Sequence, residues 1–172
     1  RSFQLNENAV SHPGEDINAL IANKYGIPYE QAKAANENIV KVAAGVGLKF
    51  DFEQIKPGNT RVSHEILKYS ESVGKADEMA QQLFAAYFEK GVDLSNEASL
   101  LELAEAIGLD QTSVQEVIHE KRYTNAVAQD QKIAREMGIN SVPFFVINDK
   151  VSVSGAQSVE HFKMAIEKSI EA

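Results

Sequence analysis

The chain has 172 residues, 44% of them apolar and 24% charged, which suits one folded domain with or without an insertion and excludes disordered, collagen-like and repeat-array proteins. Twenty-five acidic against 17 basic residues give a net charge of −8, so neither nucleic acid nor an anionic membrane surface is an expected partner. There is no cysteine, which excludes disulfides, thiolate metal sites and cysteine nucleophiles from these residues.

The first elements in chain order are a short strand and a long helical region. Phe3 and Leu5 alternate with polar neighbours, which predicts a strand. From Glu15 to Met137, apolar residues at helical spacing and glycine stops predict about seven helices. We expect them at residues 15–25, 29–46, 60–73, 75–90, 96–107, 111–119 and 123–137, with a short extended stretch at residues 48–52.

The hydrophobic period changes after Met137. Residues 142–147 are β-branched and aromatic apart from one proline, and a turn at residues 148–150 is followed by alternation over residues 151–154. This pattern predicts a β-hairpin with one fully buried strand and one half-exposed strand. Ser158 then caps a last helix, expected at residues 159–170.

A sheet interrupted by seven helices indicates that the helices are an insertion. We therefore predict an α/β platform made of residues 1–12 and 120–172, and an all-α insertion domain made of residues 13–119.

The reactive side chains form no pattern typical of an enzyme. The four histidines (His12, His64, His119 and His161) lack metal-ligand spacing, and each is expected to be a surface or packing residue. No carboxylate pair, nucleophile elbow or phosphate-binding glycine loop is present either. The sequence therefore predicts no metal site and no cofactor.

Val142-Pro143 is the exception. A proline at the start of a buried strand cannot donate a ladder hydrogen bond. Most peptide bonds that precede a proline are trans. Here, however, a helix, a short loop, Val-Pro, a hairpin, a glycine and a final helix follow one another as in the second half of a thioredoxin fold. In that context we predict a cis bond.

Several segments resemble one family. Residues 141–148 and 153–157 resemble the C-terminal signature of DsbA-like disulfide oxidoreductases of the FrnE type. Residues 1–6 are similar to that family's second strand, residues 56–64 to its Asn-Thr…His helix start, and residues 83–91 to its Leu-Phe-x-Ala-Tyr-Phe helix. The resemblance implies an α/β, thioredoxin-like fold, incomplete at the N-terminus, with a large all-α insertion domain.

The resemblance also implies a function, which is thiol–disulfide exchange on protein or small-molecule substrates in the bacterial cytoplasm. In that family a Cys-x-x-Cys pair lies at a helix N-terminus, whose dipole stabilises the thiolate. A cis proline, here Pro143, lies against the pair, and the backbone of the preceding residue, here Val142, binds extended substrate. Because the strand and helix of the pair are absent, we expect no catalytic residue in this chain and a unit of roughly 40 residues before Arg1.

Two alternatives stay open. Asn59, Thr60 and His64 begin a helix whose start resembles that near the glutathione pocket of glutathione-dependent isomerases and kappa-type transferases, in which serine replaces the reactive cysteine. They are candidate cleft residues, although a helix N-cap and a surface histidine are the simpler interpretation of Asn59 and His64. The other alternative is a non-catalytic binding module that keeps the Val142–Pro143 groove. We favour the oxidoreductase because residues 84–88 and 142–145 are more similar to that branch.

Overall fold

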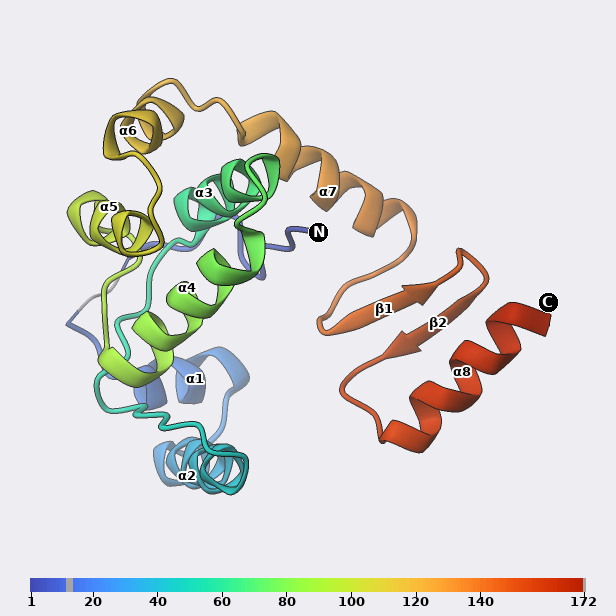
Figure 1. Ribbon diagram of the computed structural model, residues 1–172. Coiled ribbons are helices and arrows are strands. Elements are labelled where there is room, and N and C mark those ends of the chain that lie inside the picture. The colour runs from blue at the N-terminus through green and yellow to red at the C-terminus, as the bar shows by residue number, and fades with distance from the viewer. Residues whose placement is uncertain (12–13, 172) are drawn as a thin grey trace. The chain divides into compact units, whose positions relative to one another are not determined.

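The structure is a computed structural model that describes residues 1–11 and 14–171 (Figure 1). Contacts divide it into two compact units: unit 1 is residues 1–5 with the described chain from Ala128 onward, and unit 2 is the described part of residues 6–127. The helix α7 (Thr124–Glu136) crosses the boundary between them, and His12 lies outside the described residues. Among the described residues, no helix combines the length and apolarity that crossing a membrane requires.

Unit 2 is built from helices. They are α1 (Ile17–Tyr25), α2 (Tyr29–Gly45), α3 (Arg61–Ser72), α4 (Ala76–Lys90), α5 (Glu97–Ala106), α6 (Gln111–His119) and the first turn of α7. Their ends lie within two residues of the predicted ends because the signals are local. The side chains of Asp16, Asn96 and Asp110 accept hydrogen bonds from the first turns of α1, α5 and α6. Residues 48–51 belong to no helix or strand, and residue 52 begins a turn.

The core of unit 2 lies among α3, α4, α5 and α6. Ile66, Met79, Leu100 and Val114 are fully buried there, one from each helix. α3 packs against both α4 and α6, and α5 also packs against both. Each helix therefore contributes an apolar stripe to one shared core.

The start of α7 is attached to α3 inside unit 2. The buried carboxylate of Glu65 accepts hydrogen bonds from Thr124 Oγ1 (2.8 Å) and Arg61 Nε (3.2 Å). The rings of Tyr69 and Tyr123 lie 6.0 Å apart beside these bonds. A buried carboxylate needs such partners, because burial without them would be costly.

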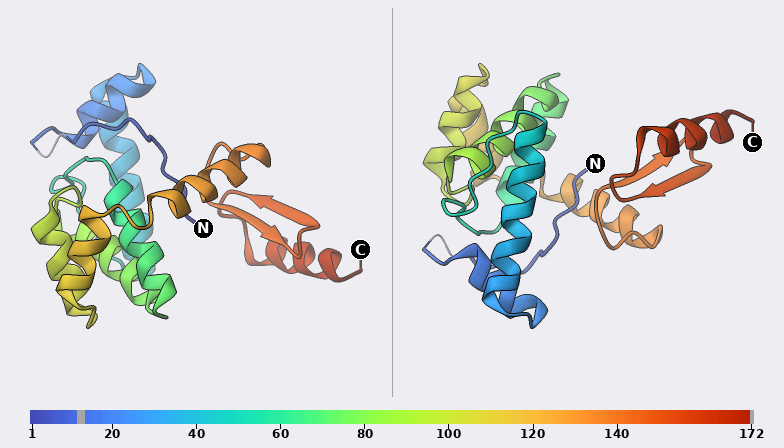
Figure 2. Two further views of the ribbon diagram at one scale, coloured as in Figure 1. Left: turned by 90° about the horizontal axis from the view of Figure 1, so that it is seen from above. Right: turned by 90° about the horizontal axis from the view of Figure 1, so that it is seen from below.

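Unit 1 contains the hairpin and the last helix. The strands β1 (Phe144–Ile147) and β2 (Val151–Ser154) pair antiparallel, and α8 (Val159–Glu171) packs against both of them (Figure 2). Asn148 and Asp149 form the turn with φ angles of 51° and 54°, a conformation that these two residue types tolerate. Phe145 meets Phe162 of α8 edge to face, with ring centroids 4.9 Å apart.

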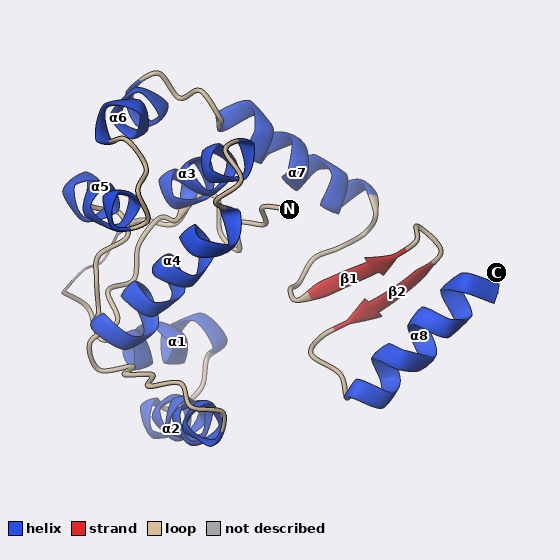
Figure 3. Ribbon diagram, viewed as in Figure 1, coloured by secondary structure: helices blue, strands red, loops and turns tan. Residues whose placement is uncertain are grey.

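Two expectations about strands are wrong. Residues 3–5 form no strand, because β1 and β2 form the only sheet in the described chain and residues 3–5 pair with neither (Figure 3). The strand expected to be fully buried is half open, with Phe145 and Val146 exposed to 41% and 38%. A strand is fully buried only where both of its faces and both of its edges are covered, and β1 has a strand neighbour at one edge only.

Candidate functional site

The two predicted groove residues lie between α7 and β1. After α7, Gly138 adopts a φ of 72° and turns the chain into a short loop. The Val142–Pro143 peptide bond that follows is cis, as predicted. The carbonyl oxygen of Pro143 accepts a hydrogen bond from the N–H of Gly155 (2.9 Å), which fixes the entry into the hairpin.

The edge of β1 that has no neighbouring strand is called the open edge here. The hydrogen bond between Pro143 and Gly155 shows which backbone groups point toward this edge. In an antiparallel pair, residues alternate between those bonded to the partner strand and those whose N–H and C=O point away from it. Pro143 is bonded to Gly155, directly after β2, and Phe145 is the next residue in register with β2, so the groups of Val142, Phe144 and Val146 point away from β2. Among the described residues, none forms a hydrogen bond with the backbone of Val142.

The open edge borders an apolar hollow of about 860 Å³ that lies within unit 1. Its lining comes from the first residues of the chain, from α7 and the loop after it, from β1 and its turn, and from α8. Val142 lines it, and both Val142 and Pro143 are exposed.

The first residues of the chain are held to α7 by side chains rather than by a sheet. The N–H of Ser2 donates to Asp130 Oδ2 (2.8 Å). The N–H of Gln4 donates to Gln131 Oε1 (2.9 Å), and Gln131 Nε2 donates to the carbonyl oxygen of Gln4 (3.2 Å). The amide of Gln131 therefore replaces a neighbouring strand for Gln4.

Sequence reasoning missed Asp130 and Gln131, although one signal was present. Together with Val127 and Ala134 they follow the spacing i, i+3, i+4 and i+7, and all four are buried. Polar residues at inward positions of a helix require hydrogen-bond partners. Here the partners are the backbone groups of residues 2 and 4.

The candidate cleft residues Asn59, Thr60 and His64 lie in unit 2, together at the start of α3. Asn59 Oδ1 accepts from the N–H of Arg61 (2.9 Å), and Asn59 Nδ2 donates to the carbonyl oxygen of Ala9 (2.9 Å). Thr60 occupies the N-cap position without a capping bond from its side chain, and His64 is half-buried in the first turn. The amide of Asn59 thus joins the loop before α1 to α3.

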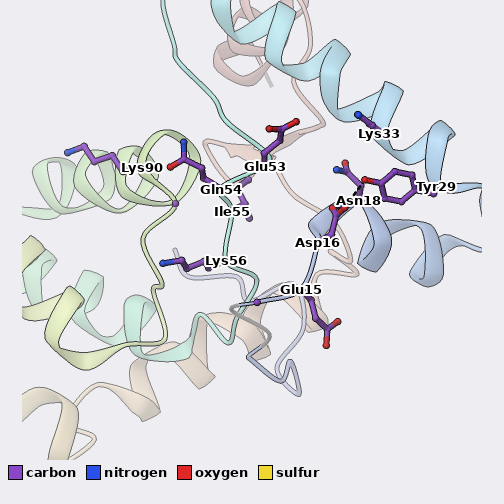
Figure 4. Close-up of a pocket in the computed structure, with 12 residues that line it drawn as sticks. Glu15, Asp16, Asn18, Tyr29, Lys33, Glu53, Gln54, Ile55, Lys56 and Lys90 are labelled. Atoms are coloured by element: carbon purple, nitrogen blue, oxygen red, sulfur yellow. Dashed lines mark hydrogen bonds between the residues drawn. The ribbon is translucent and has the colours of Figure 1, made fainter.

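A second hollow, of about 600 Å³, lies in unit 2 and is polar (Figure 4). In it the hydroxyl of Tyr29 donates to Asp16 Oδ2 (2.7 Å). This hydrogen bond lowers the pKa of Asp16 and raises the pKa of Tyr29. Three lysines (Lys33, Lys56 and Lys90) and the carboxylates of Glu15 and Glu53 also line it. Within the described chain no three histidine, aspartate or glutamate side chains form a metal site.

Comparisons with known proteins agree with the architecture. Residues 1–167 match the family model of the DSBA-like thioredoxin domain. The structure is similar to the crystal structure of a probable DsbA oxidoreductase from Streptomyces coelicolor, with a TM-score of 0.91, 28% identity and coverage of 99% of this chain and 74% of that one. These two matches confirm the predicted thioredoxin-like α/β fold with a large helical part.

A curated relative is the uncharacterized protein YwbO of Bacillus subtilis (strain 168). It is 28% identical over 131 residues, which cover 75% of this chain and 65% of YwbO. The chain therefore spans less than two thirds of that relative's length.

Proposed function

The chain belongs to the DSBA-like thioredoxin domain family, and we propose that it is the cysteine-free part of a thiol–disulfide oxidoreductase of the FrnE type. One observation supports this most: Val142 directs an unbonded N–H and C=O to an open strand edge beside Pro143, which has no N–H. An extended peptide can pair with such an edge through its backbone. Because the chain has no cysteine, the redox pair would belong to a strand–helix unit before Arg1.

In the proposed reaction, a thiolate of the pair attacks one sulfur of the substrate disulfide, and the other substrate sulfur leaves as a thiolate. The second cysteine then attacks the resulting mixed disulfide, which releases the reduced substrate and leaves the pair oxidised. The residues of this chain bind and orient the substrate without reacting. Thiol or disulfide substrates and a cytoplasmic location are part of the proposal.

Reduction of insulin disulfides by dithiothreitol tests the proposal. The full-length protein should accelerate the reaction, whereas residues 1–172 alone should not, since they contain no thiol. An intact Cys-x-x-Cys without exchange activity would contradict the proposal and favour a binding module. A lone serine in place of the pair would contradict it as well and favour a glutathione-dependent isomerase or transferase.

We also propose that Asn59, Thr60 and His64 act in the cleft of the full-length protein. Asn59→Ala and His64→Ala should then slow disulfide exchange more than they lower stability. Asn59 also holds the loop at Ala9, so exchange rate and thermal unfolding must be measured on the same samples. An equal loss of both would assign these residues a structural role only.

A further inference from the structure

The helix α2 carries an apolar stripe on its exposed surface. Its members are Ala35, Ile39, Val42 and Val46, and together they are called the α2 stripe here. The three larger side chains are exposed to 44%, 65% and 74%. Among the helices of the described chain, α2 packs extensively only against α1, on the side where Asn36 donates a hydrogen bond to Asn18 (Figure 1). Exposed apolar residues that lie this close together are typical of an interaction surface.

The spacing of the α2 stripe is that of a coiled-coil seam. Its successive members lie four, three and four residues apart, which is the alternation of the a and d positions of a heptad. A helix that packs on a globular core presents a broader apolar face. The α2 stripe is therefore suited to one further helix that lies alongside α2.

The charged residues of α2 lie away from the α2 stripe. They are Glu30, Lys33, Glu37 and Lys41, and with 3.6 residues per turn all four lie on the opposite side of the helix. An acidic or basic partner would find no complementary charge along the stripe. Two copies of this chain, each with a net charge of −8, repel each other least where their surfaces carry no charge. The charge distribution thus favours a second copy as the partner.

The α2 stripe is also complementary to itself. When two copies of α2 lie antiparallel about a twofold axis, Ile39 of each copy faces Val42 of the other, and Ala35 faces Val46. A small side chain then meets a larger one at both ends of the seam, which fills it evenly. In a parallel pair each residue would face its own copy, so the two alanines would leave a gap.

We propose that the α2 stripe is the interface of a homodimer in which two copies of α2 pair antiparallel. The seam extends over about 17 Å of helix, at a rise of 1.5 Å per residue. An interface of this length belongs to the small and reversible ones, so we expect a dissociation constant on the order of 10 μM.

Sedimentation velocity of the full-length protein between about 1 and 200 μM, with dithiothreitol present to prevent intermolecular disulfides, measures the dimer. Ile39→Lys and Val42→Glu each place a charge in the seam, at positions that are exposed in the single chain. Each should raise the dissociation constant at least tenfold. The control is Ala44→Lys, also at an exposed position but on the charged side of α2, and it should change the constant less than twofold.

An equimolar mixture of the variants Ile39→Lys and Val42→Glu tests the direction of pairing. Only antiparallel helices bring the new lysine of one copy opposite the new glutamate of the other. We expect the mixture to dimerise at least tenfold more tightly than either variant alone. In a parallel pair the two substituted positions would not meet.

A full-length protein that stays monomeric at about 200 μM would overturn the proposal. So would a dimer that both single variants leave intact, or a mixture that associates no more tightly than its components. Thermal unfolding at about 1 μM, where the chain is monomeric, should give each variant a midpoint within about 2 °C of that of the unchanged protein. If Ile39→Lys lowers the midpoint further, Val42→Glu decides the outcome, because Val42 is the more exposed of the two.

Discussion

Replacing Gln131 with alanine removes the side chain that holds the first segment of the chain. Gln131 is 5% exposed and forms two hydrogen bonds with the backbone of Gln4, of 2.9 and 3.2 Å. A buried backbone group left without its partner costs about 1–3 kcal/mol. For two such groups, partly relieved by water, we expect opening of residues 1–5 to become easier by about 2–4 kcal/mol. Alanine favours helix, so α7 itself should not weaken.

Native-state amide hydrogen exchange measures this effect residue by residue. A loss of about 2–4 kcal/mol corresponds to roughly 30- to 1,000-fold faster exchange of the Gln4 amide. The control is Gln129→Ala, which removes an exposed glutamine from the same helix. Unchanged exchange at Gln4 would refute the role given to Gln131. An equal acceleration at Ile66, in the core of unit 2, would show instead that the whole chain is destabilised.

The remaining predictions concern unit 2. Gly91→Ala should lower the free energy of unfolding by about 2–5 kcal/mol in thermal denaturation, because φ is +59° and an added Cβ would lie 2.7 Å from Gln54 Cβ and closer to its carbonyl oxygen. Gly26 has a φ of +64° and open space around it, so Gly26→Ala should lower the free energy of unfolding by only about 1–2 kcal/mol. Equal losses for the two variants would refute the role of the contact with Gln54. Tyr29→Phe should raise the pKa of Asp16 toward 3.8, so that acid protonates this helix cap at a higher pH than in the unchanged protein. An unchanged carboxyl titration of Asp16 by NMR would contradict the role of the hydroxyl.

Helices could be predicted because their signals lie within a few residues of sequence. Asp110 caps α6 and the apolar spacing continues to His119, so its predicted range, residues 111–119, agrees with the structure. The hairpin turn at Asn148 and Asp149 was equally local. These elements depend little on the rest of the chain.

Features that depend on distant partners could not be predicted. Alternation at Phe3 and Leu5 describes a segment that could pair in a sheet, but a strand forms only where another strand lies beside it. The apolar sequence of β1 likewise predicted burial, but burial depends on which distant elements cover the faces and edges of the strand, and Phe145 and Val146 are exposed. Nothing near Asn59 in sequence indicates its bond to Ala9.

The absence of cysteine shows most clearly that composition alone does not predict the function of this chain. A count of zero describes residues 1–172 correctly, yet these residues belong to a family of DSBA-like thioredoxin domains. Composition alone would have excluded redox function. The order of the family-like segments and the unbonded backbone groups at Val142–Pro143 indicate the proposed redox function instead.

Binding of a disulfide substrate at Val142 can be tested by photo-crosslinking. A photo-crosslinking amino acid is placed at position 142 of the full-length protein and irradiated during insulin reduction. We expect adducts on insulin next to a reacting cysteine, at a yield at least tenfold above that of the same group at Lys163. Active disulfide exchange with equal adduct yields at positions 142 and 163 would contradict substrate binding at Val142.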